Sequence, residues 1–317
     1  MLERRHFRVA AGVVVNANGE VLIARRDESL HQGGLWEFPG GKIERGESVE
    51  QALRRELAEE LAITMGRSEP LIRIHHAYPD RDVTLDVLRV ERFSGDPRGM
   101  LGQPFCWVAP DELPKFQFPA ANRAIVTAAR LPDRYAILDL AAAADRAALA
   151  LRLQALARAR IGLVRVRAKG LEPEQYQTLA EQVLDYCKGR AIRVLLDVVA
   201  DWAEQGGAAG VHLDSAQLRQ CAGRPVGPDR YVAASCHDLD DLEQAVAIDA
   251  DFAVLSPVLP TASHPLAKPL GWRRFAEVVS RAGLPVYALG GMHPEHRAVA
   301  RRHGGQGIAG IRGILGG

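Results

Sequence analysis

Apolar runs and amphipathic stretches alternate along the chain, and their order changes near residue 131. In the first part, apolar runs at 7–15 and 21–25 flank Asn18-Gly19, a dipeptide typical of tight turns, and they predict the two strands of a hairpin. Three more strands and two helices are expected at 71–77, 83–92, 105–108, 48–61 and 120–130. The first part therefore mixes strands and helices, and it ends near Leu131-Pro132-Asp133, where the composition changes.

From residue 134 onward, short apolar runs alternate with helical stretches. The runs lie at 134–139, 162–167, 193–198, 210–213, 231–235, 252–256, 286–289 and 307–311. Eight strands separated by helices predict a parallel (β/α)8 TIM barrel. Only a few residues follow the last run, so we expect the final outer helix of this barrel to be missing. We therefore predict two domains, one of mixed strands and helices over residues 1–131 and a barrel over residues 132–317.

The composition is that of an ordinary globular protein, and it narrows the range of partners. A chain of 317 residues exceeds what one hydrophobic core usually organises, which supports two domains. With 40 basic and 39 acidic side chains, the chain is not expected to bind long nucleic acid, whereas small phosphorylated molecules remain candidates. The apolar stretch Val9–Val15 is too short to span a membrane, so no membrane partner is expected.

The four cysteines, Cys106, Cys187, Cys221 and Cys236, are scattered along the chain without a C-x-x-C pair. This spacing favours reduced thiols and a cytoplasmic protein over a disulfide framework. The sequence does not indicate an oligomeric state.

The stretch after the glycine-rich loop predicts an amphipathic helix. Ser48 and Gln51 have the spacing of a capping box, so the helix is expected to begin at Ser48. Four aliphatic residues recur at every fourth position and would form one buried stripe: Val49, Leu53, Leu57 and Leu61.

Three carboxylates, those of Glu56, Glu59 and Glu60, lie at positions i, i+3 and i+4 of this helix and therefore share one face. Like charges at this spacing destabilise an isolated helix by roughly 0.2–0.5 kcal/mol per pair, so a bound cation is expected. Carboxylate oxygens favour Mg²⁺, with Mn²⁺ as the alternative, and Mg²⁺ usually shares its ligand shell with substrate phosphates. A lone acidic helix face is more often solvated, but the preceding glycine loop and Arg55 favour a metal and phosphate site.

Residues 41–63 follow the pattern G-x5-E-x7-R-E-U-x-E-E-x-x-U, where U is aliphatic, and so resemble the Nudix box. One position departs: Ala62 stands where a glycine usually ends the helix. The resemblance implies a Nudix α/β/α sandwich with a mixed sheet and the hydrolysis of a phosphoric anhydride. It implies Gly40, Glu56, Glu59 and Glu60 as metal ligands and Glu47, Arg55, Glu56, Glu59 and Glu60 as catalytic residues.

Over residues 7–130 the resemblance narrows to the MutT branch, the 8-oxo-dGTP diphosphatases. It is carried by Phe38-Pro39-Gly40-Gly41-Lys42-Ile43-Glu44, Arg25-Arg26 with His31, Pro79-Asp80-Arg81, and Phe118-Pro119-x-x-Asn122. This implies conversion of 8-oxo-dGTP to 8-oxo-dGMP and pyrophosphate, which sanitises the nucleotide pool and prevents mutagenic incorporation during DNA replication. The implied nucleotide-binding residues are Arg26, His31, Glu37, Phe38, Pro39, Gly40, Arg81 and Asn122. The amide of Asn122, with a donor and an acceptor, would contact the purine edge.

Leu101 departs from the MutT pattern, which has a glutamate there that helps to bind metal or to activate water. Leucine does neither. The reaction remains feasible if Glu47 and the helix carboxylates hold the metal, with a metal-bound water as the nucleophile. A weaker rate or a shifted substrate range is the expected consequence.

Residues 134–314 resemble the thiamine-phosphate synthase and TenI superfamily. The motifs are Val164-Arg165-Val166-Arg167-Ala168-Lys169, Gly210-Val211-His212-Leu213, Ala234-Ser235-Cys236-His237, Pro257-x-x-Pro-Thr261 and Leu289-Gly290-Gly291-Met292. Most of them fall at the ends of predicted strands, where barrel enzymes keep their active sites. We therefore expect a phosphate-ligand pocket formed by Arg167, Lys169, Ser235, Thr261, Ser263, Gly290 and Gly291.

The barrel departs from the synthase pattern at the residues that its chemistry requires. Val198 and Gln217 stand where acidic metal ligands are usual, His264 stands where a lysine is usual, and Asp197 replaces an asparagine. We therefore favour a barrel that is not an active synthase. Three interpretations remain open: a hydrolase of oxidised purine nucleotides, a bifunctional enzyme of thiamine metabolism, and a hydrolase whose barrel is a noncatalytic ligand sensor or interaction module.

His212, His237 and His293 are widely spaced in the barrel sequence, with no acidic cluster near them. They are expected to be structural or pocket residues rather than metal ligands.

Overall fold

The computed structural model describes residues 5–29, 32–139, 146–167, 169–197, 206–261, 266–311 and 313–315. The chain divides into two compact units, Met1–Arg130 and Leu131–Gly317, each with its own hydrophobic core. All four cysteines are free thiols, as predicted. Within the described ranges, the helices are too short or too polar to cross a membrane.

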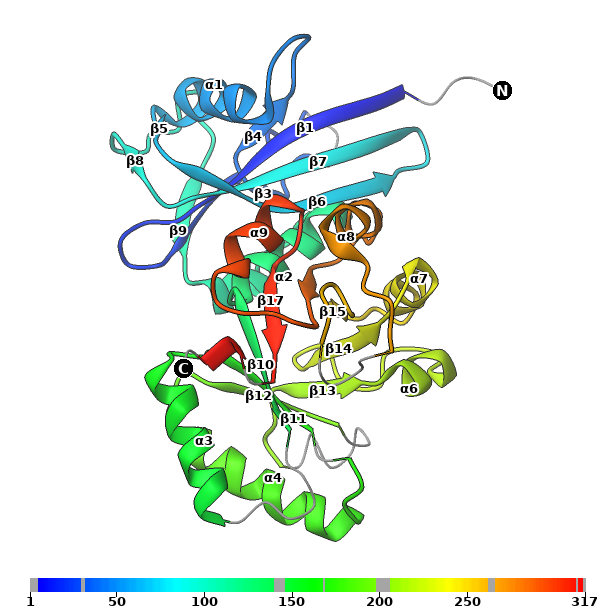
Figure 1. Ribbon diagram of the computed structural model, residues 1–317. Coiled ribbons are helices and arrows are strands. Elements are labelled where there is room, and N and C mark those ends of the chain that lie inside the picture. The colour runs from blue at the N-terminus through cyan, green and yellow to red at the C-terminus, as the bar shows by residue number, and fades with distance from the viewer. Residues whose placement is uncertain are drawn as a thin grey trace. The chain divides into compact units, whose positions relative to one another are not determined.

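The first unit is built on a mixed four-stranded sheet with the order β4-β1-β7-β6 (Figure 1). The central strand β1 (Arg5–Val14) runs parallel to β7 (Arg81–Val90) and antiparallel to β4 (Gly40–Lys42). The remaining strands are β2 (Val21–Arg25), β3 (Trp36–Glu37), β5 (Thr64–Met65), β6 (Ser68–Ala77), β8 (Phe93–Ser94) and β9 (Phe105–Val108).

Alternate residues of β1 enter two different cores, which makes this unit a three-layer sandwich. Ala10 and Val14 pack with helix α1 (Val49–Leu61), whereas Ala11 and Val13 pack with helix α2 (Arg123–Arg130). Because successive side chains of a strand point to opposite faces, the two helices cover opposite sides of the sheet. The predicted α/β/α sandwich is therefore confirmed.

The predicted hairpin around Asn18-Gly19 is wrong in its pairing, although both strands exist. β1 belongs to the four-stranded sheet, and β2 pairs with β3 and β9 in a separate three-stranded sheet. Among the described residues, the two segments are joined by one isolated antiparallel bridge, between Val15 and Val21. The Asn18-Gly19 dipeptide correctly indicated that the chain reverses its direction there. The sheets to which β1 and β2 belong are determined by strands distant in the sequence.

The helix predicted at 120–130 begins three residues later than expected. Residues Ala120–Asn122 form a 3-10 turn after Pro119, and α2 follows from Arg123. A second 3-10 helix covers Pro110–Lys115.

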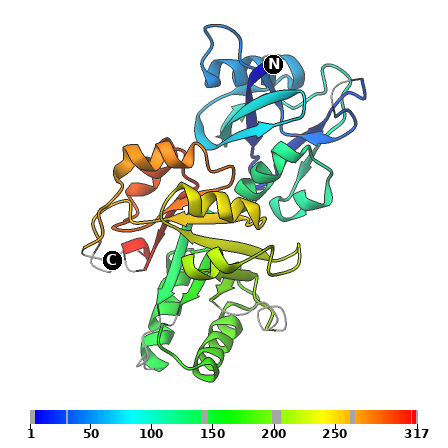
Figure 2. The same cartoon turned by 90° about the vertical axis from the view of Figure 1, so that its right-hand side faces the viewer.

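The second unit is a closed barrel of eight parallel strands, as predicted. The strands are β10 (Arg134–Asp139), β11 (Leu163–Arg167), β12 (Arg193–Leu196), β13 (Gly210–Leu213), β14 (Tyr231–Cys236), β15 (Phe252–Leu255), β16 (Val286–Ala288) and β17 (Gly307–Gly310). The described helices are α3 (Arg146–Arg158), α4 (Pro173–Cys187), α6 (Ser215–Gln220), α7 (Leu239–Ala247), α8 (Gly271–Val279) and α9 (His296–Arg302). Figures 1 and 2 show these helices outside the ring of strands. A 3-10 turn, Gly313–Leu315, follows β17.

The barrel interior has an apolar floor and a polar upper layer. Tyr135, Phe252 and Tyr287 contact one another in the floor, with ring centroids 5.3–5.7 Å apart. Because the side-chain period of a strand is two, Leu163 in the floor is followed by the inward-facing Arg165 at the next level of β11. The strands therefore carry polar groups toward their carboxyl ends, where barrel sites form.

Candidate active site and barrel cavity

Helix α1 begins as the sequence predicts and carries the acidic face. The Ser48 hydroxyl accepts a hydrogen bond from the Gln51 amide, and the Gln51 side chain accepts one from the Ser48 amide, which is a complete capping box. Leu53, Leu57 and Leu61 are fully buried, so the helix is held against the sheet. Its orientation is fixed by this stripe, and the carboxylates beside the stripe are held with it.

Arg55 connects the acidic helix to the loop before it. Its Nε and Nη2 atoms donate to the two carboxylate oxygens of Glu47 at 2.9 and 3.0 Å, and its Nη1 atom donates to Glu56 at 2.7 Å. Nη2 also donates to the Lys42 carbonyl at 3.0 Å, and the Glu59 carboxylate lies 3.6 Å from Nη1. A guanidinium with donors in a fixed planar arrangement therefore positions three of the predicted catalytic carboxylates together.

Glu60 lies in the most negative part of this site. Burial, reinforced by the neighbouring charges of Glu56 and Glu37, raises the pKa of Glu60 to about 7. Burial also raises the pKa of Glu37, which is ion-paired with Arg26. The arginines therefore balance the negative charges of these carboxylates only in part. A bound cation would relieve the remaining repulsion.

Two glycines allow the loop to approach the helix and the sheet. Gly40 has a φ of +150°, and a Cβ atom there would lie 2.1 Å from the Ala10 carbonyl oxygen. A Cβ atom on Gly41 would lie 2.2 Å from the Glu56 carboxylate. At Gly40 the positive φ and the close backbone of Ala10 require glycine, whereas at Gly41 a Cβ atom would displace the Glu56 side chain, so the β4 backbone lies beside Glu56.

The donor set fits a hard divalent cation, although the described carboxylates do not converge into a preformed group of three metal ligands. Glu56 and Glu60 are half-buried, whereas the Glu59 side chain is 61% exposed. In this arrangement Arg55 occupies one oxygen of Glu56. Carboxylate oxygens and a backbone carbonyl are ligands that Mg²⁺ accepts, and the excess negative charge at Glu60 favours its entry.

The residues that the resemblance implies for nucleotide binding have varied surroundings. Arg26, directly after β2, forms an ion pair with Glu37 of β3, and both charges act on Glu60, whose pKa Glu37 raises and Arg26 lowers. Phe38 is buried and stacks on Phe118 with ring centroids 5.3 Å apart. The carbonyl of Pro39 accepts a hydrogen bond from the Gly12 amide.

Asn122 and Arg81 lie on other elements of the same unit. Asn122 is buried at the start of α2, and its neighbour Ala121 packs in the same apolar cluster as Phe38. Arg81 is paired with Asp80 at 2.6 Å and lies over the Phe7 ring. His31 lies outside the described residues.

Leu101 stands on a loop that is bonded to the end of the acidic helix. The Met100 amide and the Gln103 side-chain amide both donate to the Glu60 carbonyl at 2.9 Å, and the Gln103 side-chain oxygen accepts from the Leu101 amide. Leu101 itself is 76% exposed. The loop is therefore bonded to the backbone of Glu60, and it carries an exposed apolar side chain where the family pattern has a carboxylate.

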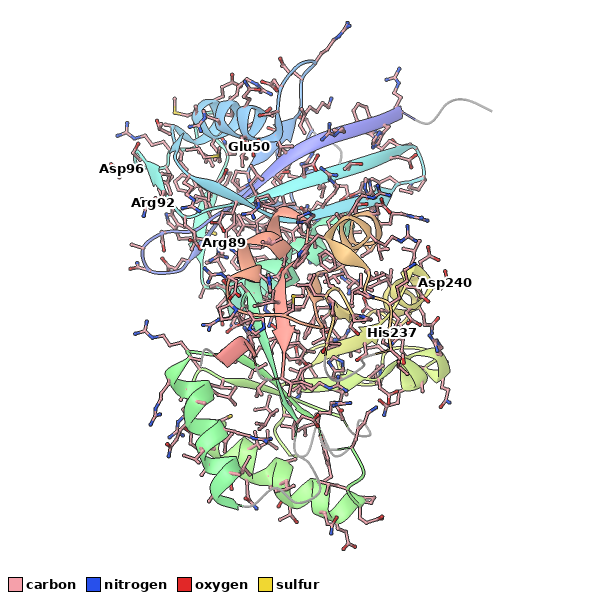
Figure 3. The ribbon with its side chains drawn as sticks, viewed as in Figure 1. Glu50, Arg89, Arg92, Asp96, His237 and Asp240 are labelled. Carbon is pink, nitrogen blue, oxygen red and sulfur yellow. The ribbon has the colours of Figure 1, made fainter. Side chains whose placement is uncertain are left out.

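The second unit contains a cavity of about 680 Å³ at the carboxyl ends of its strands. Six of the seven predicted pocket residues line it: Arg167, Lys169, Ser235, Thr261, Gly290 and Gly291. The seventh, Ser263, lies outside the described residues, as do Val198 and His264. His237, labelled in Figure 3, follows β14 and lines the same cavity. The cavity therefore combines cationic side chains with glycine backbone.

Gln217 has a structural role at the position where the synthases have an acidic residue. Its side-chain oxygen accepts a hydrogen bond from the Asp214 amide, and the Asp214 carboxylate accepts from the Ala216 and Gln217 amides. These bonds cap α6. An amide engaged in this way does not replace a metal-binding carboxylate.

A buried ion pair in the cavity was missed from the sequence. Arg165 donates two hydrogen bonds to Asp197, at 2.6 and 2.7 Å, and its side chain is almost completely buried. A charged residue inside the apolar run at 162–167 was the available signal. Its partner depends on strand register, which pairs Arg165 with Leu195 on β12, two residues before Asp197.

Two protein families match the chain in the same order as the two units. The family described as NUDIX domain matches residues 10–128, and the family described as Thiamine monophosphate synthase matches residues 135–314. Nudix hydrolases generally use divalent metal cations and act on small nucleotide substrates.

Individual relatives support each match. The 8-oxo-dGTP diphosphatase of Escherichia coli is 40% identical over 122 residues, which cover 38% of this chain and 95% of the relative. The CTP pyrophosphohydrolase of the same organism is 36% identical, over 34% of this chain and 78% of the relative. An Aquifex aeolicus protein with the provisional name thiamine-phosphate synthase 2 is 35% identical, over 49% of this chain and 83% of the relative. The chain therefore belongs to the Nudix hydrolases, which act on phosphoric anhydrides, in its first unit and to the thiamine monophosphate synthase family in its second.

Proposed function

We propose that the Nudix unit hydrolyses 8-oxo-dGTP to 8-oxo-dGMP and pyrophosphate with Mg²⁺, Mn²⁺ being the alternative ion, and so sanitises the cytoplasmic nucleotide pool. The observation that carries the proposal is the cluster of Glu47, Glu56 and Glu59 around Arg55, with the strongly perturbed Glu60 beside it. The relative named 8-oxo-dGTP diphosphatase, at 40% identity over nearly its whole length, supports the substrate. The near-zero net charge supports a small nucleotide rather than long nucleic acid.

Glu56, Glu60 and the Gly40 carbonyl are the groups that would hold the metal ion. When bound, Mg²⁺ supplies charge neutralisation for the phosphates and acidifies a ligated water. Glu59 or Glu47 orients the attacking water, and Arg55 holds both carboxylates in position. A cation held there would lower the pKa of Glu60, which is about 7 without it, and would favour the ionised carboxylate. Stabilisation of the phosphoryl charge is then the main contribution of the site to the rate.

The base would be held near Phe38 and Asn122, two of the residues that the family resemblance implies for nucleotide binding. The half-buried Phe118, which stacks on the buried Phe38, offers apolar surface, and the Asn122 amide offers a donor and an acceptor for a purine edge. Arg26, Arg81 and His31 supply positive charge or hydrogen-bond donors for the phosphates and the sugar. Glu37 and Pro39 hold the segment on either side of Phe38 in place, through the ion pair with Arg26 and the hydrogen bond from the Gly12 amide.

Steady-state hydrolysis of a substrate panel tests the proposal. We expect the highest kcat/KM for 8-oxo-dGTP, a lower value for dGTP, and much lower values for CTP and thiamine diphosphate. Glu60→Gln reports the background rate. A higher kcat/KM for CTP would instead indicate that the substrate is a pyrimidine nucleotide, as the name of the second Escherichia coli relative suggests. A preference for thiamine diphosphate would overturn the purine assignment and favour an enzyme of thiamine metabolism.

For the barrel we propose a binding site for a small phosphorylated ligand, in a unit that is not an active synthase. The specific observation is the cavity with Arg167 and Lys169 at its wall and the backbone of Gly290 and Gly291 opposite the Pro257–Pro260 turn. The missing acidic positions argue against the synthase reaction. Isothermal titration with thiamine phosphate tests the site: binding that Arg167→Ala abolishes supports it, and no binding favours a scaffold. Synthase activity in the full chain would contradict the proposal.

A further inference from the structure

Two aspartates lie close to the positions where the synthases have acidic metal ligands and this barrel has none. Asp197 follows β12 and directly precedes Val198 in the sequence, and Asp214 follows β13, three residues before Gln217. Burial raises the pKa of Asp197, and the negative charge of Asp214 adds to this rise, so the two carboxylates are near each other. Neighbouring carboxylates are the ligands from which a Mg²⁺ site could be rebuilt. What each of them contacts decides whether such a site exists.

Both carboxylate oxygens of Asp197 are occupied by Arg165. The Nε atom of Arg165 donates to Oδ1 at 2.6 Å, and its Nη2 atom donates to Oδ2 at 2.7 Å, so the ion pair is bidentate. The backbone of Asp197 is also fixed, because its amide donates to the Tyr176 hydroxyl at 2.8 Å. Arg165 lines the cavity, whereas Asp197 is not among the described residues that line it. The guanidinium, and not the carboxylate, therefore faces the cavity.

Arg165 keeps its positive charge although its side chain is only 5% exposed. Burial by itself would lower its pKa, but the hydrogen bonds to Asp197 and the charge of this carboxylate raise the pKa above the ordinary value of an arginine. A guanidinium has five N–H donors. Three of them are used by Asp197 and Ser235, so among the described residues two remain for an anionic ligand.

Asp214 is held by the start of α6 and does not form a metal site alone. One of its carboxylate oxygens accepts hydrogen bonds from two backbone amides of the first turn, both at 2.9 Å. Asp214 does line the cavity, but a divalent ion that approached it would meet the positive charges of Arg165, Arg167 and Lys169 in the same lining. The donor set of the barrel therefore does not fit the metal that the resemblance to the synthases implies.

We infer that Arg165 is a built-in cation that takes the place of a divalent metal ion in the barrel cavity, so that the cavity binds an anionic ligand without one. The ligand part of this inference rests on the proposed barrel site, whereas the exclusion of the metal depends on the residues of the chain alone. The inference predicts a gain of function. Without the guanidinium, Asp197 and Asp214 become available to a hard cation.

Mn²⁺ binding tests the exclusion of the metal without any ligand. All chains carry Glu56→Gln and Glu60→Gln, which remove the two proposed side-chain ligands of the Nudix metal site, and electron paramagnetic resonance counts the bound Mn²⁺. Adding Arg165→Gln should create an additional Mn²⁺ site, and adding Asp197→Asn to that chain should abolish it. Asp197→Asn in a chain that keeps Arg165 should leave the Mn²⁺ count unchanged.

Two outcomes of this experiment would overturn the inference: a Mn²⁺ site that is lost with Asp197→Asn while Arg165 is present, or no gain of Mn²⁺ in a folded Arg165→Gln chain. Circular dichroism and thermal unfolding report whether that chain folds, since the substitution leaves the Asp197 carboxylate without its partner. If it does not fold, the comparison of Asp197→Asn with its parent decides whether the carboxylate binds metal beside Arg165.

Thiamine phosphate tests whether the guanidinium replaces the metal in ligand binding. With Arg165 present, millimolar Mg²⁺ should change the affinity by less than about twofold. In Arg165→Gln the affinity should be at least about tenfold lower in EDTA and should recover when Mg²⁺ is added. Binding that requires Mg²⁺ while Arg165 is present would contradict the inference. If thiamine phosphate binds neither chain, the proposed barrel site fails, and the Mn²⁺ counts still decide whether Arg165 excludes the metal.

Discussion

The two sites of this chain have opposite electrostatic character. In the Nudix unit, Glu37, Glu56, Glu59 and Glu60 gather around two arginines, and the excess of negative charge raises the pKa of Glu60 to about 7. In the barrel cavity, Arg165, Arg167 and Lys169 contribute positive charge to the lining, and each arginine retains an aspartate partner. The first arrangement requires a cation before it can accept a phosphate, whereas the second presents positive charge directly.

The two sites also differ in how many of their families' functional residues they retain. The Nudix box retains its carboxylates, the arginine that positions them and the glycines that admit the loop. The barrel retains its fold and cationic wall, but it has an amide and an aliphatic residue where acidic groups would hold a metal. The two units are therefore expected to respond differently to metal removal and to charge neutralisation.

The largest effect is expected from removing a carboxylate of the acidic site. Glu56→Gln should lower kcat/KM for 8-oxo-dGTP by about 10³-fold, because the proposed metal ligand, which Arg55 positions, loses its charge. Glu50→Gln is the matched control, since Glu50 is exposed in the first turn of the same helix (Figure 3). Steady-state kinetics with circular dichroism checks both. Equal activity in the two variants would refute the assignment of Glu56.

Chelation of divalent ions should abolish the activity of the Nudix unit and leave ligand binding by the barrel almost unchanged. With excess EDTA, nucleotide turnover should fall to the background of Glu60→Gln, since the carboxylate site depends on a cation. The affinity of the barrel for thiamine phosphate should change by less than about twofold, because its wall is already cationic. Titration calorimetry on the same preparation measures the second quantity. Barrel binding that requires Mg²⁺ would contradict the contrast between the sites.

Neutralising Glu60 should stabilise the metal-free Nudix unit at alkaline pH. Because folding raises the pKa of this acid from 4.5 to about 7, the folded state binds the proton more tightly, and stability falls as pH rises across that window. Glu60→Gln should therefore gain roughly 1–2 kcal/mol at pH 8, after allowance for solvent screening, and nothing below pH 4.5. Scanning calorimetry in EDTA at several pH values measures this gain. The transition of the barrel should not move.

Restoring the missing carboxylate near Glu60 should have a smaller effect. Leu101→Glu should raise kcat by up to about tenfold, since the exposed position on the loop bonded to Glu60 tolerates a charge and the family pattern has glutamate there. Leu151→Glu, at an exposed leucine of α3 in the barrel, is the control and should leave hydrolysis unchanged. An unchanged rate in Leu101→Glu would mean that the carboxylates on α1 and the Arg55 loop already suffice.

The sequence predicted elements and motifs well because both depend on local patterns. The eight barrel strands follow from short apolar runs, and the start of α1 follows from Ser48 and Gln51. What it did not predict depends on partners distant in the chain. The pairing of β1 with β7 rather than β2, and the meeting of Arg165 with Asp197, are set by strand register, which periodicity alone does not determine.

The remaining departure from the Nudix pattern, Ala62, is resolved by the structure and gives the smallest predicted effect. Ala62 ends α1 in the left-handed region, with φ 56° and ψ 28°, and its amide donates back to the helix. That conformation costs an alanine about 1 kcal/mol, whereas glycine adopts it freely but gains more entropy on unfolding. Ala62→Gly should therefore stabilise the Nudix unit by about 0.5 kcal/mol net. Ala58→Gly, at an exposed position inside the same helix, should destabilise it by about 1 kcal/mol. Scanning calorimetry distinguishes the opposite changes in stability of the two variants. A loss of stability in Ala62→Gly would show that the left-handed conformation of Ala62 does not cost the Nudix unit stability.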